Sequence, residues 1–337
     1  MAQADLLVKL LKSGSNNDQQ TFRRIAEELI KEEKSKGHRV LAERLVKSLE
    51  PDLFQSNKIE SKRKEFGNSR VKDLIHEILP ERSLKSLVLP EKISSQLSEL
   101  IEEQHRYELL HAHNLSPRNR ILLAGPPGNG KTTLAEALAC ELMYPLFVIR
   151  YETLVGSYLG ETSSQLKQVL DYAKTQRCVL FFDEFETLGK ERGDTHETGE
   201  IKRVVSSLLL QLDALPDYVV VVAASNHPEL LDRAVWRRFQ LRIELPSPNR
   251  TQLTYFIDSI ASRTKINFGY ASETLAKHLL GSNFSDVEEF CLGIIRRAIL
   301  DRKSDNAKEI TKIKLEQWKG RLSPLQLNKD NSKDGVS

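Results

Sequence analysis

Five short apolar runs, separated by segments long enough to form helices, constrain the fold of this chain more than any other feature. The runs are RILLA (120–124), LFVIR (146–150), CVLFF (178–182), VVVVAA (219–224) and LRIEL (241–245). Strands that are apolar on both faces are typical of parallel sheets covered by helices on either side. We therefore predict an α/β fold over residues 76–247, in which a parallel five-stranded sheet forms the middle of a three-layer sandwich.

Segments with helical periodicity lie on both sides of this region. FRRIAEELI and VLAERLVKSL each place apolar residues on one face, which predicts a helical N-terminal domain or linker over residues 1–75. Residues 248–322 are again helical in pattern, and Ser285 with Glu288 three residues later predicts a capping box at a helix start. The last segment, 323–337, is polar, and we expect it to be disordered.

The composition is typical of a globular protein that does not cross a membrane. The 337 residues are 39% hydrophobic and 29% charged, and the net charge of +3 is too small to indicate a nucleic-acid or membrane partner by itself. The opening LLVKLL is short and interrupted by Lys9, so we expect no signal peptide. Cys140, Cys178 and Cys291 lie far apart in apolar stretches, which favours buried thiols in a reducing compartment over a metal site or a disulfide framework. We predict a cytoplasmic protein.

The segment GPPGNGKT directly follows the first apolar run and precedes the helical pattern TLAEALACEL. It fits the Walker A pattern G-x-x-x-x-G-K-[ST], in which glycines let backbone N–H groups surround phosphate oxygens and the helix N-terminus adds positive charge. In this pattern Lys131 reaches the β- and γ-phosphates of a nucleotide, and the Thr132 hydroxyl binds Mg²⁺. The predicted nucleotide-binding residues of the loop are Gly125, Pro126, Pro127, Gly128, Asn129, Gly130, Lys131, Thr132 and Thr133.

An acidic pair follows the third apolar run, in VLFFDEFE. Asp183 comes at the end of a predicted buried strand, as a Walker B acid does, where its carboxylate can bind Mg²⁺ directly or through water. Glu184 is then placed to orient or deprotonate the attacking water. Taken alone, the pair could equally be an ordinary turn at a strand end. Together with the phosphate loop it predicts a site that hydrolyses ATP.

Four segments together resemble the AAA ATPases, the classical clade of the AAA+ proteins: GPPGNGKT, YLGET, VLFFDEFETLG and AASNHPELLDRAVWRRF. They follow the order and spacing of that family, and the resemblance extends over about residues 85–320. It implies a P-loop NTPase fold in which the five strands lie in the order 5-1-4-3-2, followed by a small helical lid over residues 248–322. It also implies ATP and Mg²⁺ as cofactors.

The same resemblance implies roles for individual residues. Asn226 matches the sensor-1 asparagine, which faces the γ-phosphate and the attacking water. Arg237 and Arg238 match the arginine fingers, which reach the ATP of a neighbouring subunit, so that the site is complete only in a ring, usually a hexamer. The alternative is a pair of ordinary surface arginines. Phe284 stands where relatives have a glycine close to the adenine, which leaves the contacts to the base open.

Tyr158 and Leu159, in LVGSYLGE, match the aromatic–hydrophobic–glycine loop that lines the central pore of protein-translocating AAA rings. An aromatic ring can contact almost any extended peptide without reading its sequence, and the flanking glycines allow the loop to move. The alternative is a tyrosine that packs under the next helical segment, TSSQLKQVLDYAK.

These features predict an ATP-driven protein unfoldase or remodeller. HETGE does not fit the metalloprotease pattern H-E-x-x-H, because position 200 is Glu200, so proteolysis would need a partner. The sequence also resembles, more loosely, stand-alone bacterial ATPases encoded beside a subtilisin-like serine protease in phage-defence pairs. One alternative is a nucleic-acid-associated AAA+ remodeller that uses the basic run at 58–72, although no aromatic residues are interleaved with that run. Another is a scaffold that binds ATP without hydrolysing it.

Overall fold

The computed structural model of the chain describes residues 19–49, 73–150, 159–188, 207–302 and 307–330. Internal contacts divide the chain into two compact units. The sheet unit comprises Met1–Leu87, Glu91–Ala124 and Thr132–Ile243, and the helical unit comprises Val88–Pro90, Gly125–Lys131 and Glu244–Ser337. The phosphate loop therefore belongs by its contacts to the helical unit, although it joins a strand of the sheet to the next helix.

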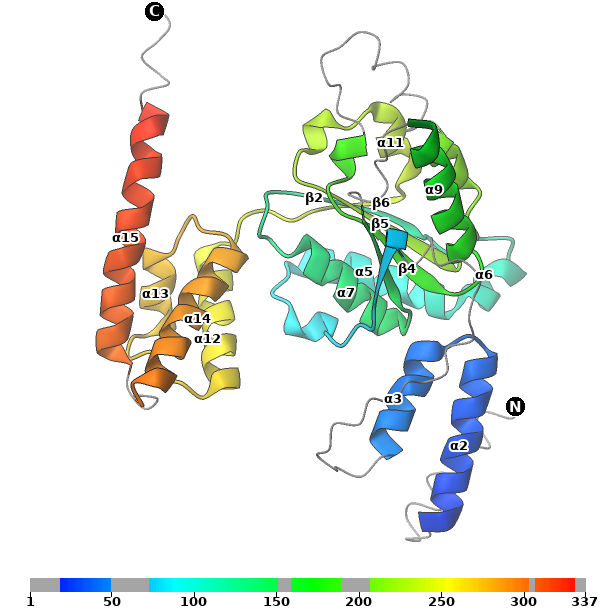
Figure 1. Ribbon diagram of the computed structural model, residues 1–337, viewed down its shortest axis with the longest axis horizontal. Helices are drawn as coiled ribbons and strands as arrows, with labels where there is room; N and C mark the ends of the chain where they lie inside the picture. The colour runs from blue at the N-terminus through cyan, green and yellow to red at the C-terminus, as the bar shows by residue number, and fades with distance from the viewer. Residues whose placement is uncertain (1–18, 50–72, 151–158, 189–206, 303–306, 331–337) are drawn as a thin grey trace, which may run out of the picture. The chain divides into compact units, whose positions relative to one another are not determined.

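The sheet unit is organised around a six-stranded sheet in the order β1-β3-β4-β5-β2-β6 (Figure 1). The strands are β1 (Ile75–Ile78), β2 (Arg120–Ala124), β3 (Leu146–Ile149), β4 (Cys178–Phe182), β5 (Val219–Ser225) and β6 (Leu241–Glu244). The pairs β3–β4, β4–β5 and β2–β5 are parallel. All five strands expected from the apolar runs are present, and they lie in the order that the family resemblance implied.

The sixth strand, β1, corrects the prediction of a five-stranded, wholly parallel sheet. It pairs antiparallel with β3 at the edge of the sheet, where Ile78 lies opposite Leu146. Its sequence is only IHEI, with His76 and Glu77 between two isoleucines. A short edge strand with polar side chains has little hydrophobic pattern of its own, so its pairing depends on a neighbour that is distant in the sequence.

Helices cover both faces of the sheet, with α9 and α11 on one side and α5 and α7 on the other (Figure 1). On the first side, Leu180 and Phe182 of β4 pack in one buried cluster with Val169 of α9 and Val235 of α11. The helices around the sheet include α5 (Glu91–His105), α6 (Tyr107–Ala112), α7 (Lys131–Leu142), α9 (Leu159–Ala173) and α11 (Arg233–Arg238). Single-turn helices follow three of the strands in the described residues: η1 (Leu84–Ser86), η2 (Phe185–Leu188) and η3 (Pro228–Leu230).

Two helices, α2 (Gln19–Ser35) and α3 (Arg39–Leu49), form a hairpin where the periodicity predicted helices. Ile25 and Leu29 of α2 and Val40 of α3 are buried in it, as amphipathic helices require. The connection passes through Gly37, whose φ of 81° lies in the left-handed region that glycine adopts without strain.

The helical unit contains α12 (Arg250–Thr264), α13 (Ser272–His278), α14 (Phe284–Leu300) and α15 (Lys308–Asp330). Its core is a separate buried cluster, to which α12 contributes Leu253 and Ile257 and α14 contributes Phe290 and Ile294. A second core of this size shows that the unit buries its own apolar surface.

The start of α14 differs from the capping box predicted at Ser285 and Glu288. Asn283 is the N-cap residue, and its side chain accepts a hydrogen bond from the backbone N–H of Asp286. Asparagine and serine can both cap a helix, and these two residues lie only two positions apart. The helix starts at the earlier one, which leaves Ser285 inside the first turn with its hydroxyl free for another partner.

The end of α15 also differs from expectation, because the helix continues to Asp330, within the segment 323–337 that was predicted to be disordered. Once a helix has formed, each further residue adds a hydrogen bond, so a polar composition does not by itself end it. Within the described ranges, no helix combines the length and the apolar character needed to cross a membrane.

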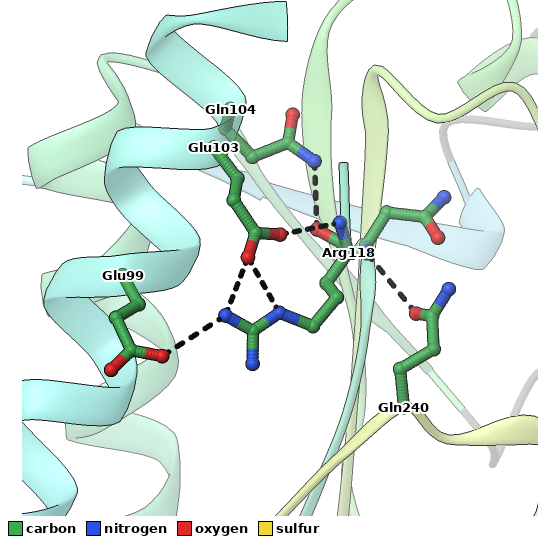
Figure 2. Close-up of polar contacts among 6 residues, drawn as sticks. Glu99, Glu103, Gln104, Arg118 and Gln240 are labelled. Carbon is green, nitrogen blue, oxygen red and sulfur yellow. Dashed lines mark hydrogen bonds and ion pairs between the residues drawn. The ribbon is translucent and has the colours of Figure 1, made fainter. Parts of the chain in front are cut away.

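Hydrogen bonds from α5 fix the start of β2, as Figure 2 shows. The Arg118 side chain donates from Nε to Glu103 Oε1 (2.8 Å), and the Arg118 backbone N–H donates to Glu103 Oε2 (2.9 Å). The buried Gln104 donates from Nε2 to the carbonyl oxygen of Arg118 (2.9 Å), and Gln240 accepts from the backbone N–H of Asn119 (3.2 Å). These bonds satisfy backbone groups just where the ladder begins, so β2 starts at a defined residue.

The Glu103–Arg118 pair predicts a measurable dependence of stability on pH. Partial burial raises the pKa of Glu103, but its hydrogen bonds to Arg118 and the charge of Arg118 outweigh that effect, so the pKa lies below its ordinary value. A carboxyl group with a depressed folded-state pKa stabilises the fold above its unfolded-state pKa and loses that contribution as the pH falls through the folded-state pKa. We expect Glu103→Gln to lower the free energy of unfolding by about 1–2 kcal/mol at pH 7 and by less at pH 3.

Urea denaturation at both pH values measures this difference. The matched control is Glu102→Gln on the same helix, because Glu102 is 60% exposed in its ion pair with Arg106 and should change stability little. Equal losses for Glu103→Gln at pH 7 and pH 3 would contradict the role given to the ionised carboxylate.

Candidate nucleotide site

The phosphate loop, Gly125–Lys131, has two glycines that no other residue could replace without a clash. A Cβ at Gly125, which has a φ of 144°, would lie 2.3 Å from the carbonyl oxygen of Leu245. A Cβ at Gly128, with a φ of 76°, would lie 2.6 Å from Cγ of Asn283. The pattern predicted glycines because the backbone must approach a phosphate closely. The structure adds that it must also pass close to its own neighbours in the helical unit.

Two polar side chains of the loop are buried. Lys131, 6% exposed, donates from Nζ to the carbonyl oxygens of Gly125 (2.7 Å) and Pro126 (3.0 Å), so its ammonium group is held against the loop. Asn129, also 6% exposed, has neither amide atom hydrogen-bonded to any of the described residues. Buried polar groups are nearly always paired, so this amide fits a loop built to receive a further polar group.

At the sheet, the side chains of Thr132 and Asp183 lie in contact. The Thr132 hydroxyl donates to Asp183 Oδ2 at 3.3 Å, and Asp183 Oδ1 accepts the backbone N–H of Glu184 at 3.0 Å. A hydroxyl and a carboxylate are the oxygen ligands that Mg²⁺ takes when phosphate oxygens and water complete its shell. The described part of the chain contains no cluster of three or more His, Cys, Asp or Glu that could bind a metal alone. The residues therefore fit Mg²⁺ bound together with a nucleotide.

Glu184 follows β4 in a strained backbone conformation. Its φ of 45° is in the left-handed region, which residues other than glycine rarely adopt. The carbonyl oxygen of Glu184 accepts the N–H of Thr187, which closes the single turn of η2, and the side chain is exposed. Strain of this kind is common at functional sites because it points a side chain away from the path of the strand. No feature of the sequence predicted it.

Asn226 lies at the same edge of the sheet as Asp183 and Glu184. β4 and β5 are parallel, with Phe182 opposite Ala223, so the residues that follow the two strands emerge side by side. Asn226 is half-buried, and its backbone N–H donates to Oε1 of Glu186 at 3.1 Å. The sequence analysis identified Asn226 only through a resemblance and missed Glu186, although Glu186 is the third acid of VLFFDEFE.

The structure distinguishes the two arginines at the end of α11. Asp232 caps this helix by accepting the N–H of Ala234 at 2.8 Å. Arg237 is exposed and forms no hydrogen bond or ion pair with any described residue. Arg238 donates from Nε to Oδ2 of Asp213 in the same chain at 2.9 Å. The family motif predicted the same role for both arginines. It did not predict the contact with Asp213, which lies 25 positions before Arg238.

In the helical unit, the first turn of α14 contacts the phosphate loop. The N–H and the hydroxyl of Ser285 both donate to the carbonyl oxygen of Gly128, at 3.1 and 3.2 Å. Phe284, the residue for which the family resemblance left the contacts to the base open, packs edge-to-face against Phe256 at 5.0 Å between ring centroids. The Phe284 ring therefore packs within the helical unit.

The predicted pore loop and the basic run at 58–72 lie outside the described residues. Tyr158 is not described, and Leu159 is the first residue of α9, with a side chain that is not described. The predictions for Tyr158 and Leu159 therefore stay predictions.

A glycine-rich loop between a buried strand and a helix, with an acid at the end of a nearby parallel strand, defines a P-loop nucleoside triphosphatase. Residues 121–247 match the family described as "ATPase family associated with various cellular activities (AAA)". An uncharacterised AAA family ATPase from Sinorhizobium fredii is 36% identical over 306 residues, which cover 90% of this chain and 91% of that relative. The chain belongs to the AAA family of ATPases, and it is an ATP hydrolase.

Two further relatives match over shorter regions. A 26S proteasome regulatory subunit homologue from Methanothermobacter marburgensis is 33% identical over 190 residues, 55% of this chain and 51% of that relative. A cell division cycle protein 48 homologue from Archaeoglobus fulgidus is 32% identical over 207 residues, 60% of this chain and 28% of that relative. This chain thus spans about half or less of the length of these two proteins.

Proposed function

We propose that this ATPase assembles into a ring, with six subunits as in its family, and uses Mg²⁺-dependent ATP hydrolysis to unfold or remodel proteins that pass through a central pore. The observation that carries the catalytic part is the grouping of Thr132, Asp183, Glu184 and Asn226 at one edge of the sheet. The part that concerns protein substrates is supported by the relatives named as proteasome regulatory subunit and cell division cycle protein 48 homologues.

In the proposed reaction, Lys131 and the loop N–H groups bind the phosphates of ATP, and Thr132 and Asp183 hold the metal. A bound Mg²⁺ neutralises charge on the β- and γ-phosphates. Glu184 accepts a proton from water as the water oxygen bonds to the γ-phosphorus and the bond to the bridging oxygen of ADP breaks. Asn226 orients that water, because an amide can accept from water and donate to phosphate.

We expect Glu184→Gln to bind ATP normally and to hydrolyse it at least about a hundredfold more slowly, since the amide cannot take up the proton. Phosphate release under saturating ATP measures the rate, and a fluorescent ATP analogue measures binding. Lys131→Ala is the matched control, because it should lose binding as well as turnover. Normal turnover by Glu184→Gln would assign the proton transfer to another group.

Ring assembly would bring the arginines of one subunit to the ATP of the next. Arg237 supports this assignment because it is exposed and uncommitted among the described residues, whereas Arg238 is already bound to Asp213. A guanidinium group at the γ-phosphate neutralises the charge that moves during transfer.

We expect Arg237→Ala/Arg238→Ala to be nearly inactive alone and to regain activity when mixed with inactive Lys131→Ala, because each protein supplies what the other lacks at a shared interface. Phosphate release from the mixture, in rings verified by mass, is the measurement. Arg233→Ala, at the exposed start of the same helix, is the control and should keep wild-type activity. Verified mixed rings that stay inactive would argue against fingers that act between subunits.

Tyr158 is proposed to grip the substrate polypeptide, on the strength of the pore-loop resemblance. We expect Tyr158→Ala to keep basal ATP hydrolysis and to change stability by no more than about 0.5 kcal/mol, as for an exposed loop residue. Unfolding of a tagged protein should fail, and Tyr158→Phe should retain it because the ring face makes the contact. A loss of several kcal/mol on truncation, with ATPase activity falling in parallel, would show instead that the ring is packed in a core.

A nucleic-acid-associated remodeller is the alternative function, and it rests on the basic run at 58–72. Stimulation of ATP turnover by DNA, with none by an unfolded protein, would favour it over protein remodelling. The pairing with a subtilisin-like serine protease in phage defence rests on sequence resemblance, and co-purification with such a protease encoded beside this chain tests it.

A cytoplasmic location is also proposed, and the cysteines support it. Cys140, Cys178 and Cys291 are buried and none of them forms a disulfide within the described residues. Burial, with a smaller effect from the nearby Glu288, raises the pKa of Cys291 to about 12, and burial likewise raises that of Cys178. Protonated, buried thiols are unreactive and fit a protein of a reducing compartment.

A further inference from the structure

Glu186 is a buried acid that the proposed reaction does not use. It lies in η2, two residues after Glu184, and is 3% exposed. Its Oε1 accepts the backbone N–H of Asn226 at 3.1 Å, and its Oε2 is buried with no hydrogen-bond partner in the described part of the chain. A buried carboxylate with one unmatched oxygen is unfavourable for the folded state, so packing does not explain its presence.

The Glu186 carboxylate holds the backbone N–H of Asn226. A second hydrogen bond holds the backbone at the next residue, His227. The backbone N–H of His227 donates to the hydroxyl of Ser225 at 3.1 Å, and Ser225 is completely buried at the end of β5. The Asn226 side chain, in contrast, makes no hydrogen bond with any described residue. Its backbone is thus held in place while its amide group stays available.

The same short helix also fixes Glu184. The N–H of Thr187 donates to the carbonyl oxygen of Glu184 at 2.8 Å, and Asp183 accepts the N–H of Glu184. Glu186 extends from this turn to the end of β5. One side chain therefore connects the loop that carries Glu184 with the loop that carries Asn226.

We propose that Glu186 is a positioning residue that sets the place of Asn226 relative to Glu184 by holding the Asn226 N–H. The inference rests on the proposed role of Asn226 at the attacking water. It assigns Glu186 no contact with ATP, so substitution should change the rate of the chemical step more than nucleotide affinity. Displacement of a reacting group by about 1 Å can cost a hundredfold in rate.

Two substitutions of Glu186 distinguish the effect of its hydrogen-bond acceptor from the effect of its side-chain volume. Glu186→Gln keeps an oxygen that can accept the Asn226 N–H, and we expect kcat to stay within a few-fold of wild type. Glu186→Met has a similar length but no acceptor, and we expect kcat to fall about ten- to a hundredfold with KM for ATP little changed. Glu229→Met, at an acid of η3 that is 65% exposed and paired with His227, is the matched control and should behave as wild type.

Thermal melts accompany the kinetics. A Glu186→Met protein that melts earlier but turns over normally below its melting temperature would overturn the inference, because the residue would then be only structural. A Glu186→Gln protein as slow as Glu186→Met would also overturn it. Should Glu186→Met fail to fold, Glu186→Asp replaces it. Its carboxylate is too short to hold the N–H in place, and the same fall in kcat is expected.

A double-mutant cycle with Asn226→Ala distinguishes failure of this inference from failure of the proposed function. If Glu186 acts through Asn226, the double variant should be no slower than Asn226→Ala alone. Losses that multiply would overturn the positioning role while leaving the role of Asn226 intact. A wild-type kcat for Asn226→Ala would overturn the role of Asn226 and, with it, this inference.

Discussion

Parallel hydrogen bonding between β4, β5 and β2 is the constraint on which the site depends. In a parallel sheet all carboxyl ends lie at one edge, and the register places Phe182 opposite Ala223 and Ala124 opposite Ser225. The residues that follow these strands therefore emerge next to one another, although they are far apart in the sequence. A shift of one residue in any of these pairings would turn the side chains to the other face and separate the groups.

Three locally unfavourable features lie at this edge of the sheet or in the phosphate loop that leaves it. Glu184 adopts a left-handed backbone conformation, Asn129 has a buried amide without partners in the described residues, and Glu186 has a buried oxygen without one. Each is destabilising on the scale of about 1–3 kcal/mol. The apolar strands behind them are fully buried and stabilise the unit enough to hold these groups in place.

The first turn of α14 and the phosphate loop are in direct contact within the helical unit. Ser285 at the start of α14 donates twice to the carbonyl oxygen of Gly128, and Asn283 packs where a side chain on Gly128 would have to lie. A rotation of α14 would pull directly on the loop.

The sequence by itself determined the class of the fold and the phosphate site. Apolar runs report buried strands directly, and the loop pattern is local, because backbone geometry over eight residues requires those glycines, the lysine and the hydroxyl. The family resemblance supplied the strand order. The antiparallel strand β1, the choice of Asn283 over Ser285 as the helix cap, and the contacts of Glu186 and Arg238 were decided only by tertiary structure. Each depends on a partner from another part of the chain, or on competition between neighbouring residues of similar propensity. A local sequence pattern reports neither the distant partner nor the outcome of such a competition. A glutamate or an arginine has the same propensity whether its side chain faces solvent, Asn226 or Asp213.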